Sequence, residues 1–242
     1  MFASLPRTTQ NIDVRTRLIF ALDFESPEKA KAMVQQLGDA VSFYKVGLEL
    51  FMAGSYFELV NWLLEQGKQV FVDLKFFDVP QTVGSAVRQL QHKGVTFATV
   101  HGNDAILKAA VAEKGNLKIL AVTALTSLDQ QDLNDLGFQC DVQQLVLSRA
   151  RRAIELGCDG VISSGLEAEP LRAHLGDQFL IITPGIRPLA NVDDQKRTVD
   201  VEEAFQKGAD YIVVGRPIKQ AADPYKAATD IQARIQNIFN QN

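Results

Sequence analysis

The sequence predicts an α/β fold made of a single domain, a (β/α)8 TIM barrel. Three observations support this prediction. Short runs rich in β-branched and aromatic residues recur along the 242 residues, a longer amphipathic stretch follows each run, and the runs number eight. Strands that are apolar on both faces and alternate with helices form a parallel sheet covered by helices. Eight such units match a (β/α)8 barrel, with a doubly wound open sheet as the alternative.

The predicted strands follow one another at fairly even intervals from residue 17 onward. They are RLIFALD (17–23), VSFYKVG (41–47), QVFVDLK (69–75), VTFATVH (95–101), LKILAVT (117–123), DGVISS (159–164), FLIITPG (179–185) and DYIVVGR (210–216).

The amphipathic stretches carry helix start and stop signals. In the first of them, Ser26 is placed to cap a helix, Pro27 suits its first position and Gly38 suits its end. Residues 57–67 and 141–157 end with glycine in the same way. No proline-, glycine- or serine-rich linker divides the chain. We therefore expect an N-terminal arm of residues 1–16 and one catalytic barrel domain of residues 17–242.

Charge, hydropathy and cysteine content argue against several classes of protein. The net charge of −4 comes without a block of Lys or Arg that could neutralise a row of phosphates, so nucleic-acid binding is not expected. No uncharged apolar stretch approaches the roughly 18 residues of a membrane span, and the N-terminus lacks a signal-peptide segment. Cys140 and Cys158 belong to no CxxC or Cys/His cluster, which is typical of neither a disulfide framework nor a zinc site. We expect a cytoplasmic protein that does not bind membranes.

The carboxyl ends of the predicted strands are polar. In a barrel these ends face the active site, whatever the chemistry. Asp23 ends the first strand, Lys45 nearly ends the second, Asp73 and Lys75 end the third, and His101 ends the fourth. The fifth, seventh and eighth strands lead to Thr126, Arg187, Gly215 and Arg216. These side chains are therefore expected to meet at one mouth of the barrel.

Three charges interrupt the apolar stretch FVDLKFFDVP: Asp73, Lys75 and Asp78. Residues two apart on a strand share a face, so Asp73 and Lys75 should lie side by side. Opposite charges about 4 Å apart attract by roughly 4 kcal/mol at an effective dielectric near 20, so the charges are expected to be paired. A structural ion pair is one interpretation, but the second carboxylate and Lys45 favour an alternating array. Carboxylates stabilise the charged form of such a lysine, and a held ammonium can deliver a proton to a specific carbon.

Two glycine-containing loops after the seventh and eighth strands are typical of a phosphate site. They read TPGIRP (183–188) and VGRPI (214–218). Barrels often hold phosphate at this place with backbone N–H groups and a short helix N-terminus. Gly185 and Gly215 would let the backbone approach closely, and Arg216 can make paired charge-assisted hydrogen bonds. Either loop alone could be an ordinary turn, but two at neighbouring strand ends favour a phosphate site.

Together these motifs resemble the orotidine 5′-phosphate decarboxylase family, in particular its bacterial members. The matching motifs occur in the family's order and cover nearly the whole chain after the arm: ALDF, YKVGLELF, DLKFFDVPQTV, AVTALTS, TPGIRP followed by DQKR, and VVGRPI. The resemblance implies decarboxylation of orotidine 5′-phosphate to UMP and CO2, the last step of de novo pyrimidine nucleotide synthesis. It also implies a homodimer that uses neither a metal nor an organic cofactor.

The resemblance further implies a role for each matching residue. Lys75 would protonate C6 of the pyrimidine, with Asp73 beside it near the departing carboxylate. Asp78 and Thr82 would reach into the active site of the partner subunit, so that Lys75, Asp73 and Asp78 form the catalytic set. The remaining positions would bind substrate: Asp23 and Lys45 the ribose hydroxyls, Thr126 the pyrimidine, and Arg187, Gln195, Gly215 and Arg216 the phosphate, the loop from Arg187 to Gln195 closing over it.

One segment departs from the family pattern. Bacterial members commonly have small residues such as Ala-Ser-Gly-Gly after the fourth strand, whereas VHGNDA occurs here. We therefore assign no role to the loop after His101 and expect His101 itself to be a hydrogen-bonded structural residue rather than a catalyst.

Two alternative functions stay open. A magnesium-dependent decarboxylase of the 3-keto-L-gulonate 6-phosphate type uses a similar Asp-x-Lys-x-x-Asp element. Pro80, the LTS sequence at 125–127 and the two phosphate loops favour the pyrimidine enzyme instead. A non-catalytic barrel that binds a phosphate ligand would not need the complete set of Asp73, Lys75 and Asp78.

Overall fold

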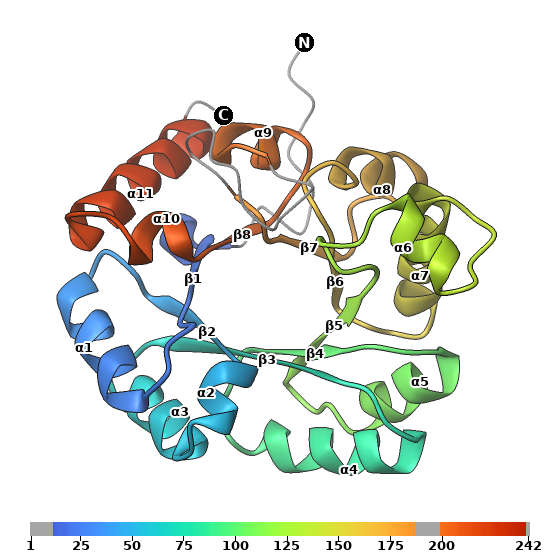
Figure 1. The fold of residues 1–242 in the computed structure, drawn as a ribbon, viewed down its shortest axis with the longest axis horizontal. Helices are drawn as coiled ribbons and strands as arrows, with labels where there is room; N and C mark the ends of the chain where they lie inside the picture. Colours follow the sequence, from blue (N-terminus) through green and yellow to red (C-terminus); the bar gives the residue numbers. More distant parts are fainter. Residues whose placement is uncertain (1–11, 187–198, 241–242) are drawn as a thin grey trace.

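The computed structural model describes residues 12–186 and 199–240, which form a closed parallel barrel surrounded by helices (Figure 1). Its strands are β1 (Leu18–Ala21), β2 (Phe43–Gly47), β3 (Gln69–Phe76), β4 (Phe97–Val100), β5 (Lys118–Val122), β6 (Gly160–Ile162), β7 (Leu180–Thr183) and β8 (Tyr211–Val214). Each strand pairs in parallel with the next, and β8 pairs with β1. The predicted (β/α)8 barrel is confirmed, and the alternative of an open doubly wound sheet is wrong.

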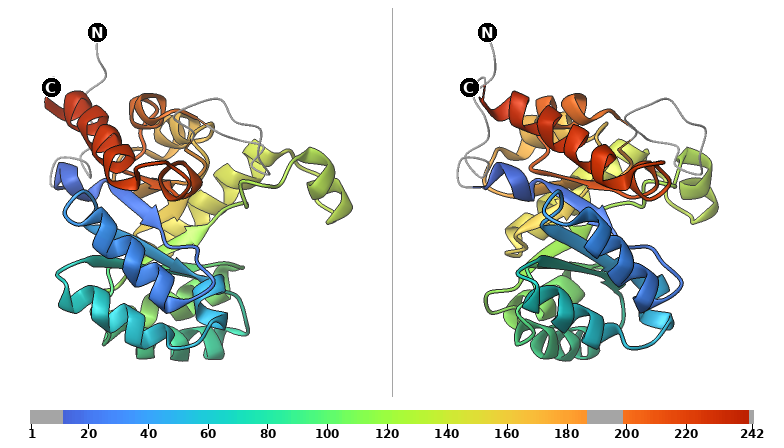
Figure 2. Two further views of the ribbon diagram at one scale, coloured as in Figure 1. Left: turned by 60° about the vertical axis from the view of Figure 1, so that its left-hand side comes forward. Right: turned by 90° about the vertical axis from the view of Figure 1, so that its left-hand side faces the viewer.

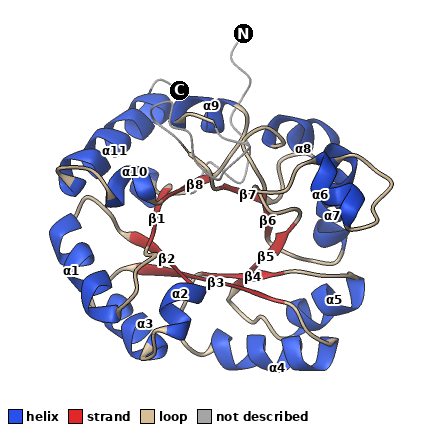
Figure 3. Cartoon of the chain, in the orientation of Figure 1, coloured by secondary structure: helices blue, strands red, loops and turns tan. Residues whose placement is uncertain are grey.

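Helices cover the outside of the barrel (Figure 3). They are α1 (Pro27–Leu37), α2 (Leu48–Met52), α3 (Tyr56–Glu65), α4 (Pro80–Gln91), α5 (Asp104–Ala112), α6 (Gln130–Asp135), α7 (Val142–Glu155), α8 (Ala168–Leu175), α9 (Val201–Gln206), α10 (Arg216–Lys219) and α11 (Pro224–Asn240), with a short 3-10 turn, η2 (Val14–Thr16), before β1. The helix α11 lies against α1, α9 and α10 on the outer surface (Figure 2). Among the described residues, no helix has the length and apolar character needed to span a membrane.

The first helix shows why local sequence is enough to place many of these elements. The Ser26 side chain accepts a hydrogen bond from the Lys29 N–H, and Pro27 occupies the first helical position, where its missing N–H costs nothing. Gly38 follows the helix with φ of 51°, and its N–H donates to the Val34 carbonyl. Both ends of α1 therefore lie where the sequence predicts them.

The predicted N-terminal arm meets the barrel through η2. Asp13 caps this turn by accepting from the Arg15 N–H at 2.9 Å. The Arg15 side chain donates to the Asp39 carbonyl at 2.9 Å, and the Gln232 side chain donates to the Arg15 carbonyl at 3.0 Å. Residues 13–16 thus pack on the barrel. The boundary between residues 16 and 17 stays a prediction, because most of the predicted arm lies outside the described residues.

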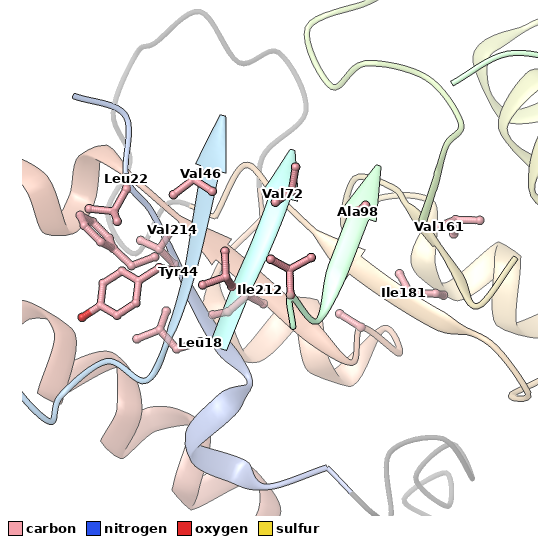
Figure 4. Packing of buried hydrophobic residues seen from close by; sticks show 14 of the residues in the cluster. Leu18, Leu22, Tyr44, Val46, Val72, Ala98, Val161, Ile181, Ile212 and Val214 are labelled. Carbon is pink, nitrogen blue, oxygen red and sulfur yellow. The ribbon is translucent and has the colours of Figure 1, made fainter. Parts of the chain in front are cut away.

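Alternate residues of each strand belong to two separate apolar clusters. The outward cluster includes Leu18, Tyr44, Val46, Val72 and Ala98 and packs under the helices (Figure 4). The inward cluster fills the barrel; its members are Ile19, Ala21, Phe43, Phe71, Phe97, Leu120, Leu180, Ile182, Tyr211 and Val213. The Phe97 ring lies 5.2 Å from both the Phe43 and the Tyr211 ring, centroid to centroid, so the interior is a packed core rather than a pore.

The inward face changes from apolar to polar toward the carboxyl ends of the strands. Residues two apart on a strand point to the same face, so a polar residue two positions after an inward aromatic also points inward. This holds for Phe43 and Lys45 on β2, Phe71 and Asp73 on β3, and Phe97 and Thr99 on β4. The polar mouth is therefore the next layer above the aromatic core.

Two ion pairs, one buried and one partly buried, tie the strands together at the opposite, amino end of the barrel. Asp210, just before β8, accepts from the Arg172 guanidinium at 2.7 Å and from a backbone N–H of β7 at 2.8 Å. Asp159, just before β6, accepts in the same way from the Lys114 ammonium at 2.7 Å and from a backbone N–H of β5 at 2.8 Å. Each carboxylate joins a cation of the outer layer to the neighbouring strand.

Candidate active site

A cavity of about 350 Å³ lies at the carboxyl ends of the strands. Seven of the predicted site residues line it: Asp23, Lys45, Asp73, Lys75, Thr126, Gly215 and Arg216. Two others, Asp78 and Thr82, line a neighbouring hollow that shares Lys75 with this cavity. Arg187 and Gln195 lie outside the described residues. The barrel thus brings together positions that are nearly 200 residues apart in the chain, from Asp23 to Arg216.

Four charged side chains of alternating sign lie along one wall of the cavity. The Lys45 Nζ is 3.5 Å from Asp23 Oδ1 and 3.3 Å from Asp73 Oδ2, and the Lys75 Nζ is 2.9 Å from Asp73 Oδ1. The side chain of Asp73 is 11% exposed and that of Lys45 14%, whereas that of Lys75 is 35% exposed. Asp73 is therefore held between two cations, and Lys75 is the cation of this pair that is more open to the cavity.

The array keeps its buried members ionised. Burial alone would raise the pKa of Asp73, because a carboxylate loses hydration in the interior. The charges of Lys45 and Lys75, together with hydrogen bonds from Lys75 and Thr99, outweigh burial and hold the pKa of Asp73 below its ordinary value. Burial would likewise lower the pKa of Lys45, but Asp73 and Asp23 raise it above its ordinary value. Asp73 and Lys45 are therefore both charged at neutral pH.

The backbone of Lys75 departs from regular strand geometry. The sequence predicts Asp73 and Lys75 side by side on one strand face, and the two side chains are indeed in contact. Lys75, however, has φ of 48°, in the left-handed region that residues with a Cβ rarely adopt. The pairing of β3 with β4 also shifts register between Val72 and Phe76. The lysine is therefore presented from a bulge rather than from a regular strand.

An apolar wall completes the cavity. It is formed by Phe71, Val122, Ile162 and Val213, and Leu125 stands at the mouth with 43% of its surface exposed. The sequence analysis did not name these residues, although the alternation along each strand could have placed them on the inner face. A cavity lined by both charged and apolar side chains suits a flat ring that carries an anionic group on one edge.

Sequence reasoning also missed Thr99. Its side chain is fully buried and donates a hydrogen bond to Asp73 Oδ1 at 2.9 Å. The available signal was its position two residues after Phe97 and two before His101, which puts it on the inward face of β4.

The ends of β7 and β8 form the glycine-lined part of the cavity. Gly185 has φ of 80°, a conformation that favours glycine over any residue with a Cβ. Gly215 joins β8 to α10, and Arg216 is the first residue of that short helix. Together with Pro184, these residues lie on the same cavity as the charged array.

Asp78 and Thr82 are exposed and do not line the cavity of their own chain, although Lys75 borders both that cavity and the hollow that they line. They share a hollow of about 360 Å³ with Leu48, Phe51 and Phe77. These three apolar side chains are 56%, 43% and 66% exposed, respectively, which is unusual for large apolar residues that lie next to one another. The prediction that Asp78 and Thr82 serve a partner subunit stays a prediction in this single chain.

His101 has the hydrogen bond expected of a structural residue. Its Nδ1 lies 3.2 Å from the Val122 carbonyl, and burial lowers the pKa of the ring. It borders a second hollow, of about 650 Å³, outside the charged cavity and shared with Phe77, Asn103 and Arg149. Within residues 12–186 and 199–240, no group of three or more His, Cys, Asp or Glu side chains is placed to hold a metal ion.

Comparisons with known proteins agree with the resemblance read from the motifs. The family model described as orotidine 5'-phosphate decarboxylase / HUMPS family matches residues 16–231. An orotidine 5'-phosphate decarboxylase of Methylococcus capsulatus is 64% identical over 94% of this chain and 95% of its own length. One of Xanthomonas euvesicatoria is 50% identical over 93% of this chain and 94% of its own length.

A solved structure is similar over the same span. The crystal structure of an orotidine 5'-phosphate decarboxylase from Lactobacillus acidophilus matches with a TM-score of 0.82 and 36% sequence identity, covering 91% of this chain and 99% of that one. Fold, motif order and sequence identity all point the same way. This chain therefore belongs to the orotidine 5′-phosphate decarboxylase family.

Proposed function

We propose that this chain converts orotidine 5′-phosphate into UMP and CO2, the last step of de novo pyrimidine nucleotide synthesis. Membership of the family and 64% identity to a decarboxylase of that name support this activity. The single observation that carries the chemistry is the contact of Lys75 with the buried, ionised Asp73 at the wall of a cavity that also contains Arg216. One end of this cavity suits a reacting carbon and the other suits a phosphate.

Lys75 supplies the electrostatic stabilisation and the proton. The bond between C6 and the carboxylate carbon breaks, CO2 leaves, and the electron pair stays on C6, where no ring position delocalises it well. The Lys75 ammonium offsets this developing charge and then donates its proton to C6, which yields UMP. The neutral amine regains a proton from solvent after the product leaves. Because the ammonium is already held by Asp73, it need not reorganise during the reaction.

Asp73 orients Lys75 and maintains a negative charge beside it. Its Oδ1 accepts from Lys75 and its Oδ2 lies 3.3 Å from Lys45, so the carboxylate cannot rotate without losing one of the two cations. A substrate carboxylate placed near Asp73 would be repelled until CO2 departs. The array therefore favours the state in which negative charge has moved from the carboxylate to C6.

The remaining predicted residues bind the rest of the nucleotide. Asp23 and Lys45 suit the ribose hydroxyls, since both lie on the cavity and carry charge-assisted hydrogen-bonding groups. Thr126 suits the pyrimidine. Arg216, with Gly215 beside it, suits the phosphate, and Arg187 and Gln195 are predicted to bind it as well but lie outside the described residues.

The active enzyme is a cytoplasmic homodimer in this proposal. Asp78 and Thr82 do not line the cavity of their own chain, and they stand among exposed apolar side chains that a second copy of the chain would bury. In an isologous dimer each subunit can contribute the same residues to its partner's site.

Mixing two inactive variants tests this sharing. Lys75→Ala and Asp78→Ala are each expected to have little activity alone. After unfolding and refolding together, about a quarter of the sites should have both residues, because half of the dimers are mixed and each mixed dimer has one intact site. Mixed dimers that form but recover no turnover would contradict shared sites.

The proposed activity is tested by following loss of orotidine 5′-phosphate absorbance with EDTA-treated, cofactor-free protein. We expect turnover that EDTA does not reduce. Turnover that requires added magnesium would favour the sugar-phosphate decarboxylase type, to be assayed with 3-keto-L-gulonate 6-phosphate. Binding of UMP without any turnover would favour a non-catalytic phosphate-ligand barrel.

A further inference from the structure

We propose that Thr99 is a positioning residue for the decarboxylation, which sets both the backbone conformation of Lys75 and the orientation of the Asp73 carboxylate. The role rests on the proposed function, because it matters for turnover only if Lys75 is the proton donor. Thr99 does not line the cavity, so it acts through these two residues rather than on the substrate.

The conformation of Lys75 needs an explanation in the surrounding structure. Only Ser55 and Lys75 adopt positive φ among the non-glycine residues that the structure describes. Such a conformation is unfavourable for a residue with a Cβ and persists only where neighbouring contacts stabilise it. Ser55 precedes a helix in an exposed turn, whereas Lys75 lies within β3. The contacts that hold Lys75 must therefore come from the adjacent strands.

The register of β3 and β4 identifies the contact. Val72 pairs with Ala98, and the next pair joins Phe76 to Val100. Three residues of β3, Asp73 to Lys75, therefore lie opposite a single residue of β4, which is Thr99. Regular ladder pairing is lost at this point, and the Lys75 N–H donates to the Thr99 side-chain oxygen at 2.9 Å instead. The Thr99 hydroxyl thus takes the place of a backbone carbonyl.

The same hydroxyl also fixes the carboxylate. A hydroxyl oxygen that accepts one hydrogen bond can still donate its own hydrogen, and Thr99 donates it to Asp73 Oδ1 at 2.9 Å. That oxygen also accepts from the Lys75 ammonium at 2.9 Å. The result is a closed ring of hydrogen bonds: the backbone of Lys75 to Thr99, Thr99 to Asp73, and Asp73 to the side chain of Lys75.

Threonine suits this position for two reasons. Its β-branched side chain is restricted about χ1, so the hydroxyl is held in one direction. Thr99 is also fully buried, so water does not replace either hydrogen bond if the hydroxyl is removed. Valine has nearly the same shape but can form neither bond, whereas serine keeps both the donor and the acceptor.

The first test compares Thr99→Val with Thr99→Ser. In Thr99→Val, kcat should fall on the order of 100-fold, as expected when a reacting group is misplaced, with KM and UMP affinity little changed because the phosphate and ribose contacts remain. Thr99→Ser should keep most of the activity. The matched control is Thr123→Val, which removes another fully buried hydroxyl, one that donates to the Ile162 carbonyl and does not touch the array. Its kcat should stay near that of the unmodified protein.

A pH profile separates positioning from a general loss of stability. The Thr99 hydrogen bond stabilises the charged form of Asp73, so its removal should move the acid limb of the kcat profile to higher pH. The other charged groups at Asp73 are Lys45 from β2 and Lys75 from β3, and the Tyr56 phenol from α3 lies close enough to sense the carboxylate. None of these groups is replaced in the variant, and a longer Lys75–Asp73 contact would move the acid limb in the same direction. Equal loss of kcat in Thr99→Val and Thr123→Val, without a shift of the acid limb, would overturn the proposal.

The effect of Thr99 on the geometry of Lys75 and Asp73 can be tested without measuring turnover. In a crystal structure of Thr99→Val, the φ of Lys75 should leave the left-handed region and the Lys75–Asp73 contact should lengthen, while Thr99→Ser should keep both. If Thr99→Val does not fold, Thr99→Cys, with a weak donor and a weak acceptor of similar size, replaces it. An unchanged Lys75 conformation and contact in the folded variant would overturn the proposal, whereas an inactive unmodified protein would instead overturn the proposed function.

Discussion

The two ends of this barrel contain similar pairs of charged side chains, but the pairs have different partners and different roles. At the amino end, Asp210 and Asp159 each accept from one cation and from one backbone N–H of a neighbouring strand. At the carboxyl end, Asp73 contacts two lysines, and one of them, Lys75, remains 35% exposed and lines the cavity. The carboxylates at the amino end bind a cation and the backbone of a neighbouring strand, whereas the carboxylate at the mouth binds two cations and a side-chain hydroxyl.

The difference shows how burial and partners decide what an ion pair does. Arg172 also donates to the carbonyls of Gly208 and Phe179, and Lys114 to that of Gly157, so these cations are engaged with the protein. Removing one member of such a pair leaves its partner's charge and the backbone groups it bound without that contact, which destabilises the fold most where the pair is buried. An ammonium with an open side toward a cavity can instead bind and protonate a ligand. We therefore expect changes at the amino end to reduce stability and changes at the mouth to reduce activity.

The largest difference is expected between Lys75 at the mouth and Lys114 at the amino end. Lys75→Ala should lower kcat for orotidine 5′-phosphate by about 10⁴-fold or more, because both the proton donor and its charge are lost. UMP binding, measured by calorimetry, should persist. Lys114→Ala, at the amino end, should lower the melting temperature but leave kcat of the folded protein close to normal. Near-normal turnover in Lys75→Ala would remove this lysine from the mechanism.

Two arginines extend the comparison to the phosphate end. Arg216→Ala should lower kcat/KM on the order of 100-fold, because binding energy from the remote phosphate is used to reach the transition state. The matched control is Arg151→Ala, on the exposed face of α7, which should behave like the unmodified protein. Steady-state kinetics measure both effects. Unchanged kcat/KM in Arg216→Ala would contradict the assignment of the phosphate end.

Removal of one charge at the amino end should reduce the stability of the protein rather than its activity. Asp210→Asn should lower the free energy of unfolding by about 3 kcal/mol, because the Arg172 charge then lacks its buried partner. Urea unfolding measures this, and kcat of the folded variant should hardly change. Asp230→Asn, in the exposed pair with Lys226, should cost much less, because solvent screens this pair. Equal losses of unfolding free energy in Asp210→Asn and Asp230→Asn would contradict the expectation that the buried pair contributes more to stability than the exposed one.

The smallest expected effect is on acid stability. The folded-state pKa of Asp73 lies below its ordinary value of 3.8, so its ionisation stabilises the fold fully above that value and this contribution disappears as pH falls through the folded-state pKa. Asp73→Asn should therefore show a flatter dependence of unfolding free energy on pH below about pH 4 than the unmodified protein. Parallel pH curves for the two proteins would indicate that the Asp73 pKa is not lowered by folding.

Much of the fold could be predicted because its signals are local. Ser26, Pro27 and Gly38 fix the ends of α1 through contacts within one or two helical turns. The eight apolar runs contain all eight strands except the last residue of β3, Phe76. Most of the polar residues predicted at their carboxyl ends reach one cavity, but His101 borders a different hollow, so the expectation that it meets the others was wrong. The family motifs also implied a role for several charged residues, and those roles stay predictions. These features depend on residues that are close to one another in the chain, or on a strand–helix pattern that repeats along the chain.

The bulge at Lys75 and the role of Thr99 could not be predicted in this way. Thr99 is 24 residues from Lys75 and 26 from Asp73, and its hydroxyl meets them only because β3 and β4 pair in one particular register. The alternation of inward and outward side chains along β4 indicates that Thr99 points inward, but not which atoms it contacts.

The sequence by itself therefore determined the order of strands and helices, the polar character of one mouth and the adjacency of Asp73 and Lys75. Only the tertiary structure decided that β8 closes onto β1, that Lys45 bridges Asp23 and Asp73, and that Lys75 is presented from a left-handed bulge held by Thr99. Backbone preference and side-chain alternation act over a few residues, whereas these contacts arise from the register between strands, which packing of the whole barrel sets.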